Sequence, residues 1–392
     1  MDIVIIADFC GQLDDESNRF IYLAKSLSKN GQKVELITSD FNHARKEHFQ
    51  SIPQNDCFKI TVLHEKSYKR NISFSRLLAH FLWGVEVKHY IERRSIPDVV
   101  YCAVPVLTAS FFAGEYCRKH EVRFIIDIQD LWPEAFGMVF KNEAFKGIVF
   151  TPFRFLSRNI YKNADEIIAV SREYVDFALE NNRRKANGYE AYIGIDLDAH
   201  DSYLENDLLL KKKNNELWLG YCGTLGTSYD IESVLDALSI LSNEAPKFII
   251  MGDGPLEKRF RLYAQRMDVD VVFMGRLQYA DMVPILNKCD IAVNPIAKES
   301  VASIIGKHAD YAAAGLPVIN TQRNREYMEL IENYSMGFNC NIGDGRDIAE
   351  KLEFLLNDQS LRREMSKNAR YCAECCFDRK ITYKKIMEVI QK

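Results

Sequence analysis

Short runs rich in β-branched residues alternate with longer segments of helical periodicity along the chain, in two successive series. Such an alternation is typical of parallel strands joined by helices. The first series contains DIVIIAD, KVELITSD, DVVYCAV, VRFIIDI and ADEIIAVS, and the second contains LWLGYCG, KFIIMGDG, VDVVFMG, IAVNPI and LPVIN. The sequence therefore predicts an α/β fold with two Rossmann-like, doubly wound parallel sheets.

A polar break separates the two series. The stretch KKKNNE precedes the first strand of the second series, and a length of 392 residues fits two domains. We expect an N-terminal domain over 1–200, a linker over 201–216, a C-terminal domain over 217–376, and a C-terminal helix over 377–392 that packs back on the N-terminal domain.

Composition and charge exclude several classes of protein. A hydrophobic share of 47% and a charged share of 27% fit a folded chain. The net charge of -4 argues against general phosphate neutralisation, so we expect no nucleic-acid partner. The opening MDIVIIADF lacks a basic n-region and a cleavage site and is predicted to be a strand. No window approaches the roughly 20 uncharged apolar residues of a transmembrane helix.

The ten cysteines are scattered along the chain. The closest group, Cys372, Cys375 and Cys376, lacks the second pair that a zinc site requires, so no metal ligands are predicted. Scattered thiols fit a reducing compartment, where cysteine acts as a small buried hydrophobe. We therefore expect a cytoplasmic protein.

Small or loop-forming residues follow four successive strands of the second series, where a doubly wound sheet binds its ligands. Glycines allow close backbone approach, and a helix N-terminus attracts phosphate. A plain βα turn is the alternative for each motif taken alone. The candidate residues at these strand ends are Gly223, Thr224, Gly226, Ser228, Gly252, Asp253, Gly254, Arg276 and Pro295.

A further candidate segment is SIIGKHADY, which begins at Ser303. If a helix begins near Ile305, its amides at Gly306 and the Lys307 ammonium can meet a diphosphate. Asp310 can then accept hydrogen bonds from ribose hydroxyls. The alternative is that Lys307 and Asp310 form a solvated helix face.

Taken together in order and spacing, the motifs YCGTLG, IIMGDGP, VVFMGR, DIAVNP and SIIGKHADYAAAGLPVI resemble those of the retaining glycosyltransferases of family four, the group 1 transferases with the GT-B fold. The first half adds NRFIYLAKSLSKNGQKVELITSD, IIDIQDLWPE, ADEIIAVS and YIGID. The pattern looks most like capsule and O-antigen transferases of surface polysaccharide biosynthesis. This resemblance implies two Rossmann-like domains with a cleft between them and a donor site in the C-terminal half.

The resemblance also implies a reaction. A hexosyltransferase-type enzyme of this family moves a sugar from a nucleoside diphosphate to a hydroxyl of a saccharide acceptor, often lipid-linked, with retention and without a metal or other cofactor. Charge develops on the departing diphosphate, so fixed amides and cations should be the main catalytic aids. Gly226, Arg276 and Lys307 are the candidates. No nucleophile is predicted, because the departing phosphate is thought to help deprotonate the incoming hydroxyl.

Two departures from the family pattern bear on activity. In the family's Glu-x7-Glu motif, Asp310 stands second and Ala302 replaces the first acid, for which Glu299 is a possible substitute. Gln129 stands where relatives place a histidine before Asp-Leu-Trp-Pro. Glutamine donates hydrogen bonds but takes no proton. A non-catalytic partner protein is therefore an alternative function, and a sugar-nucleotide epimerase of the same fold is another.

Polar residues of the first half are acceptor-side or donor-side candidates. Asp127, Asp130 and Glu134 follow a strand, with Asp130 the predicted catalytic residue; a glycoside hydrolase or simple capping is the alternative. Asn18 and Arg19 are candidates for diphosphate contact, with helix capping as the alternative.

The segment over 140–162 combines five basic residues with one acid and interleaved phenylalanines. This pattern suits an interfacial helix on the cytoplasmic face of an anionic membrane. The alternative is a core-packed helix with solvated cations.

Overall fold

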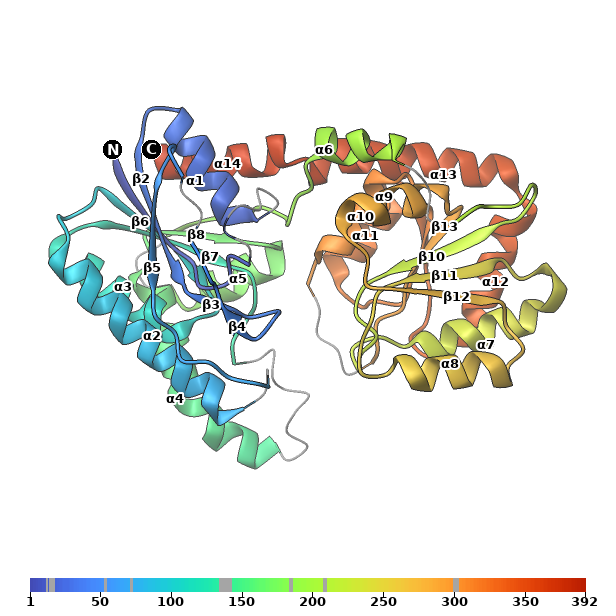
Figure 1. The fold of residues 1–392 in the computed structure, drawn as a ribbon, viewed down its shortest axis with the longest axis horizontal. Helices are drawn as coiled ribbons and strands as arrows, with labels where there is room; N and C mark the ends of the chain where they lie inside the picture. Colours follow the sequence, from blue (N-terminus) through green and yellow to red (C-terminus); the bar gives the residue numbers. More distant parts are fainter. Residues whose placement is uncertain are drawn as a thin grey trace. The chain divides into compact units, whose positions relative to one another are not determined.

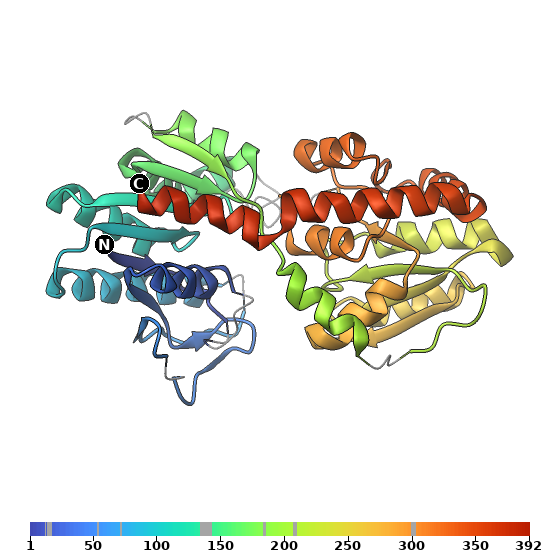
Figure 2. The same ribbon diagram turned by 90° about the horizontal axis from the view of Figure 1, so that it is seen from above.

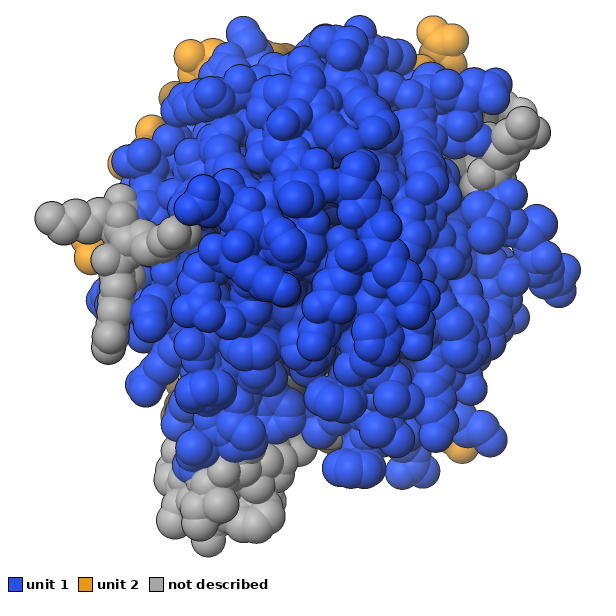
Figure 3. All heavy atoms as spheres, turned by 90° about the vertical axis from the view of Figure 1, so that its left-hand side faces the viewer, with its two compact units in different colours: residues 1–192, 383–392 blue, residues 193–382 orange. Residues whose placement is uncertain are grey.

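The computed structural model describes residues 1–11, 13, 18–52, 55–70, 73–133, 143–182, 186–206, 210–298 and 303–392. The chain folds into two compact units, which Figure 3 colours separately. Unit 1 comprises 1–192 together with 383–392, and unit 2 comprises 193–382. Figures 1 and 2 show the elements of each unit.

Unit 1 contains a seven-stranded, all-parallel sheet (Figure 1). The central strand β1 lies between β2 and β6, and its residues Ile3, Val4 and Ile5 have no exposed surface. A short antiparallel pair, β3 (Phe41–Asn42) and β4 (Glu47–His48), lies outside this sheet. In spatial order the strands are β5 (Lys59–Leu63), β2 (Lys33–Ser39), β1 (Asp2–Ile6), β6 (Val99–Val104), β7 (Arg123–Ile128), β8 (Glu166–Ala169) and β9 (Asn187–Glu190).

The last residues of the chain complete the core of unit 1. Tyr383, Ile386 and Ile390 of α14 (Arg379–Gln391) belong to the same buried cluster as residues of β1 and α1. Arg123 on β7 donates hydrogen bonds to the carbonyls of Val389 and Ile390. The other helices of unit 1 are α1 (Arg19–Lys29), α2 (Phe74–Arg93), α3 (Leu107–His120), α4 (Glu143–Asn163) and α5 (Arg172–Glu180).

Unit 2 contains a six-stranded parallel sheet in the order β12 (Val271–Gly275), β11 (Lys247–Met251), β10 (Trp218–Cys222), β13 (Ile291–Asn294), β14 (Val318–Asn320) and β15 (Gly337–Asn339). From β10 the chain builds outward to β12 and then returns to β13 on the other side of β10. Doubly wound sheets bind ligands beyond the carboxyl ends of strands at such a reversal. The two sheets confirm the predicted α/β architecture.

The helices of unit 2 surround this sheet. They are α6 (Leu197–Ser202), η2 (Tyr203–Glu205), α7 (Ile231–Leu241), η3 (Ser242–Glu244), α8 (Glu257–Arg266), α9 (Tyr279–Lys288), α10 (Gly306–Ala313), α11 (Arg325–Asn333), α12 (Gly345–Asn357), α13 (Gln359–Cys372) and η4 (Ala373–Phe377). Across the described ranges, no helix combines the length and the hydropathy that crossing a bilayer requires.

The boundary between the units lies between residues 192 and 193, whereas the sequence led us to expect the first domain to run to residue 200. The physical reason is the anchoring of α6. Asp201 at its end accepts two hydrogen bonds from the Arg370 guanidinium on α13, over 2.8 and 2.7 Å. These bonds tie α6 to unit 2.

Candidate functional site

Two glycine-rich turns pack backbone to backbone beyond the carboxyl ends of β10 and β11. The amide of Gly223 donates to the carbonyl of Met251 over 3.0 Å. A Cβ added to Gly252 would lie 1.8 Å from the carbonyl oxygen of Gly223, and one added to Gly254 would lie 2.4 Å from that of Leu225. Only glycine permits so close an approach, so Gly252 and Gly254 shape the floor of this edge through packing.

Lys307 points at the same turn from the first turn of α10. The residue is 8% exposed, and its Nζ lies 3.9 Å from the ring centroid of Tyr229 and 4.3 Å from that of Tyr221. Nζ has no hydrogen-bond partner among the described residues. A Cβ on Gly223 would lie 3.0 Å from it. Burial lowers the pKa of Lys307 to about 8.

Unpaired buried polar atoms gather around the start of α10. Within the described part of unit 2, four buried side-chain polar atoms lack a hydrogen-bond partner, and three of them are Lys307 Nζ, Ser303 Oγ and Asn294 Oδ1. Asn294 ends β13, and Ser303 precedes α10. Because buried polar groups in native proteins are almost always paired, this concentration indicates a site for a polar ligand.

A buried amide network fixes the segment that leads into α10. Asn294 Nδ2 donates to Asn320 Oδ1 over 2.8 Å and to Gln322 Oε1 over 3.0 Å. Gln322 Nε2 in turn donates to the carbonyl of Ser303 over 2.9 Å, and Asn320 Nδ2 donates to Asn339 Oδ1 over 2.9 Å. Sequence reasoning missed this network. Its signal was an asparagine at the last position of β13, β14 and β15, which pair in register.

Asp310 lies one turn after Lys307 on α10. Its Oδ1 accepts a hydrogen bond from the Tyr279 hydroxyl over 3.0 Å. Burial raises the pKa of Asp310 to about 6, although the Tyr279 hydroxyl and the charges of Arg379 and Lys307 lower it. The burial of Lys307 speaks against a fully solvated face for this pair.

The other strand-end candidates differ in position. Residues 224–228 and Pro295 form one connected edge, since the amide of Asp230 donates to the carbonyl of Pro295 over 2.8 Å and that of Ala297 to the carbonyl of Ser228 over 2.9 Å. Thr224 and Asp253 are exposed, while Gly226, Ser228 and Gly306 are half-buried. Arg276 is exposed after β12, an edge strand that β11 separates from β10.

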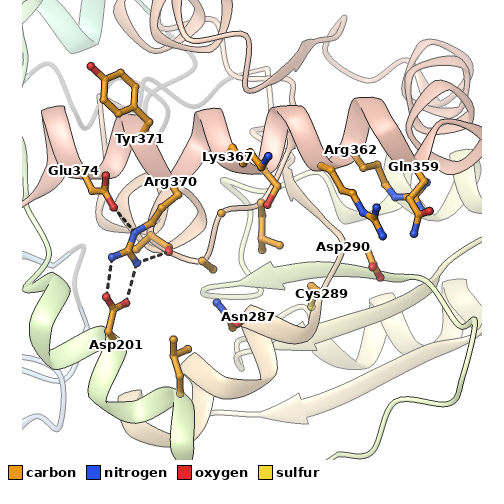
Figure 4. Close-up of a pocket in the computed structure, with 17 residues that line it drawn as sticks. Asp201, Asn287, Cys289, Asp290, Gln359, Arg362, Lys367, Arg370, Tyr371 and Glu374 are labelled. Carbon is orange, nitrogen blue, oxygen red and sulfur yellow. Dashed lines mark hydrogen bonds and ion pairs between the residues drawn. The ribbon is translucent and has the colours of Figure 1, made fainter.

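A cavity of about 900 Å³ in unit 2 lies at the opposite edge of the sheet (Figure 4). It is lined by Asp290, which precedes β13, by Leu316, which precedes β14, and by side chains of α13. Arg370 closes one side through ion pairs with Asp201 at 2.7 Å and Glu374 at 3.0 Å. Since ligands of doubly wound sheets bind at carboxyl ends, this cavity is not the candidate site.

Two first-half candidates are buried together in an ion pair. Asp127 is fully buried, and its carboxylate pairs with the Arg19 guanidinium over 2.8 Å and accepts from the Tyr101 hydroxyl over 2.6 Å. Both charges are therefore engaged in the interior of unit 1, so Arg19 does not reach a diphosphate and Asp127 does not reach an acceptor. Asn18 caps α1, accepting from the amides of Phe20 and Ile21.

Asp130 is exposed just beyond the carboxyl end of β7, and Gln129 beside it is half-buried. The structure therefore leaves Asp130 accessible within unit 1. Glu134, Glu299 and Ala302 lie outside the described residues, as does 140–142, the start of the predicted interfacial segment.

Part of the chain matches a known family of proteins. The family model of the group 1 glycosyl transferases matches residues 207–371. The chain is 24% identical to the capsular polysaccharide biosynthesis glycosyltransferase CapM of Staphylococcus aureus over 57% of its own length and 60% of the relative's. It is also 24% identical to the putative colanic acid biosynthesis glycosyl transferase WcaI of Escherichia coli, over 62% of each chain. The chain thus spans about three fifths of the length of these curated relatives.

Among solved structures, the Anabaena protein HepE in complex with UDP superposes on the whole chain. The TM-score is 0.72 at 17% identity, with 100% of both chains covered. The chain therefore has the GT-B fold, and its residues 207–371 belong to the group 1 glycosyl transferase family.

Proposed function

We propose that the protein is a retaining glycosyltransferase that moves a hexose from a UDP-sugar to a hydroxyl of a saccharide acceptor in surface polysaccharide biosynthesis. The main support for this proposal is the Lys307 ammonium, which is buried without a hydrogen-bond partner beside the glycine turn that follows β10. HepE has been solved with UDP and with UDP-glucose, and the names of CapM and WcaI refer to capsular polysaccharide and colanic acid. These proteins suggest uracil as the base of the donor and a surface polysaccharide as the product.

The site chemistry fits a nucleoside diphosphate. The Lys307 ammonium and the first amides of α10 offer positive charge to the diphosphate, and this charge counts most when the bond to the sugar breaks. Asp310 offers an acceptor to ribose hydroxyls, since its Oδ2 is not the oxygen bonded to Tyr279. Gly226 adds a main-chain contact, and Arg276 is a further cation proposed near the donor. No side chain is assigned as nucleophile or general base.

The acceptor side is proposed to lie at the carboxyl edge of unit 1, with Asp130 as the contacting carboxylate. Unit 1 also carries a basic groove of about 660 Å³ lined by Arg154, Arg158 and Lys162 of α4, beside Phe155, which is 62% exposed. Cationic heads next to an exposed ring suit an anionic lipid surface. We expect cosedimentation with vesicles containing anionic lipid, and loss of it in an Arg158→Glu, Lys162→Glu variant.

The donor site is tested by thermal unfolding with UDP, GDP, dTDP, CMP and ADP. A ligand that binds only the folded state raises the midpoint. We expect UDP to raise it for the native protein and for Lys258→Met, which changes an exposed lysine of α8, and not for Asp310→Ala. If no nucleotide at millimolar concentration raises the unfolding midpoint of the folded native protein, the proposed donor site is wrong.

Measuring the consumption of UDP-sugar with and without an acceptor distinguishes a transferase from an epimerase and from a non-catalytic partner protein. An active transferase converts UDP-sugar to UDP in the presence of an acceptor. An epimerase consumes the donor equally well without an acceptor. A non-catalytic partner binds UDP-sugar and leaves it unchanged under both conditions.

A further inference from the structure

Unit 1 holds a second concentration of unpaired buried polar atoms. Both carboxylate oxygens of Asp8 and the Oε1 of Glu65 have no hydrogen-bond partner among the described residues. Each of the two side chains is 1% exposed. Asp8 follows β1, and Glu65 follows β5, so both lie at the carboxyl edge of the sheet. Ser39, the last residue of β2 between them, donates to the other oxygen of Glu65 over 2.7 Å.

An imidazole on α2 faces the two carboxylates. His80 is 4% exposed, and its Nε2 lies 3.9 Å from Asp8 Oδ2 and 3.9 Å from Glu65 Oε1. The nearest ligand atoms of all three residues lie within 4.8 Å of one another. Ligands held at roughly 2.0–2.2 Å by one ion lie about 3–4 Å apart, so small side-chain movements would bring these three onto a common ion.

The surroundings limit the access of water. The His80 ring stacks on Trp132 with centroids 5.5 Å apart, and the Phe9 ring lies 5.7 Å away. Arg76 Nε donates to His80 Nε2 over 3.4 Å, a long hydrogen bond. Burial and the facing Glu65 carboxyl raise the pKa of Asp8 well above its usual range, and burial also raises the pKa of Glu65. A divalent cation would compete with the protons that burial favours on these carboxyl groups, and it would be held by the oxygens that have no hydrogen-bond partner among the described residues.

We propose that Asp8, Glu65 and His80 bind one divalent transition-metal ion through two carboxylate oxygens and one imidazole nitrogen. Mixed oxygen and nitrogen ligands suit ions such as Mn²⁺ and Zn²⁺. On metal binding, His80 Nε2 would coordinate the ion and lose its hydrogen bond from Arg76. The ion crosslinks the ends of β1 and β5 to α2 within unit 1, and it takes no part in the reaction proposed for unit 2. The proposal stands apart from the proposed function.

The test uses the full chain after treatment with EDTA and desalting. MnCl2 and ZnCl2 are added separately, unbound metal is removed, and the retained metal is measured by mass spectrometry alongside the unfolding midpoint. We expect about one retained ion per chain and a raised midpoint for the native protein. Asp8→Asn should retain no ion, and added metal should leave its midpoint unchanged.

A second cluster in the same unit provides the matched control. Asp40, His48 and His64 also place ligand atoms within 4.8 Å, and the His64 side chain is 74% exposed. His64→Gln should leave the retained ion in place. If the folded native protein retains no ion of either metal, or if His64→Gln loses it while Asp8→Asn keeps it, the proposal is wrong. Should Asp8→Asn fail to fold, His80→Gln is measured in its place, with the same loss expected.

Discussion

Lys307 is the residue on which the proposed donor site depends most. A buried ammonium without a hydrogen-bond partner costs free energy, and the two aromatic rings beside it recover only part of that cost. A buried cation that destabilises the fold is expected at a functional site, where its charge binds a ligand. The lowered pKa of Lys307 turns this reasoning into two measurable consequences.

The first consequence concerns stability. The pKa of Lys307 is about 8 in the fold against 10.5 for an ordinary lysine, so the unfolded chain binds more protons between these values. Lys307 therefore destabilises the fold below pH 8. As the pH rises from 8 to 10.5 this destabilisation is lost, and the free energy of unfolding increases. Lys307→Met should raise the free energy of unfolding at pH 7 by about 1–3 kcal/mol in urea titrations. The gain should shrink above pH 8, and a loss of stability at pH 7 would contradict the burial argument.

The second consequence concerns ligand binding. Below pH 8 the Lys307 ammonium is charged and attracts a diphosphate, and above pH 8 binding must first protonate the amine. The affinity for UDP should fall about tenfold per pH unit above 8. Lys307→Arg keeps its charge in this range, so whatever affinity it has should show no such fall. Calorimetry across pH 6.5 to 9.5 measures both proteins.

Among the elements, α10 depends on the strands beside it. The amide network of Asn294, Asn320 and Gln322 joins the ends of β13 and β14 to the segment before α10. The position of Lys307 is thus set in part by side chains at the ends of the neighbouring strands.

Replacing the centre of this network tests that dependence. Gln322→Leu leaves the Ser303 carbonyl without its donor, and the free energy of unfolding should fall by about 1–3 kcal/mol. The affinity for UDP should fall as well, measured well below the unfolding temperature. Gln265→Leu, on the exposed face of α8, should change neither quantity. An unchanged affinity in folded Gln322→Leu would show that the network does not position α10.

In unit 1, α1 is joined to β7 by the ion pair of Arg19 with Asp127. Arg19→Met leaves the fully buried Asp127 carboxylate without its cation, and the free energy of unfolding should fall by about 3–5 kcal/mol. Arg325→Met removes the 91% exposed partner of Glu329 on α11, and it should cost less than about 1 kcal/mol. Equal losses in chemical denaturation would contradict the structural role of the buried pair.

For the whole molecule, local patterns predicted the sheets and the glycine turns, because β-branched runs and strand-end glycines are readable within ten residues. Ion pairs and hydrogen bonds between residues far apart in the sequence could not be predicted. Arg19 looked like a loop cation, and its partner Asp127 lies 108 residues away. The network of Asn294 and Gln322 joins residues 28 positions apart. The anchoring of α6 rests on Asp201 and Arg370, separated by 169 positions. The roles of the site residues and of the two units as acceptor and donor domains stay predictions.

The measurement that bears most directly on the proposed donor site is calorimetric titration of UDP into the native protein and Lys307→Met at pH 7, with Lys258→Met as control. We predict one site per chain in the native protein and the control. We predict at least tenfold weaker binding in Lys307→Met, with its fold confirmed by circular dichroism. Equal affinity in all three proteins, or no binding by the folded native protein, would contradict a UDP-sugar site at the start of α10.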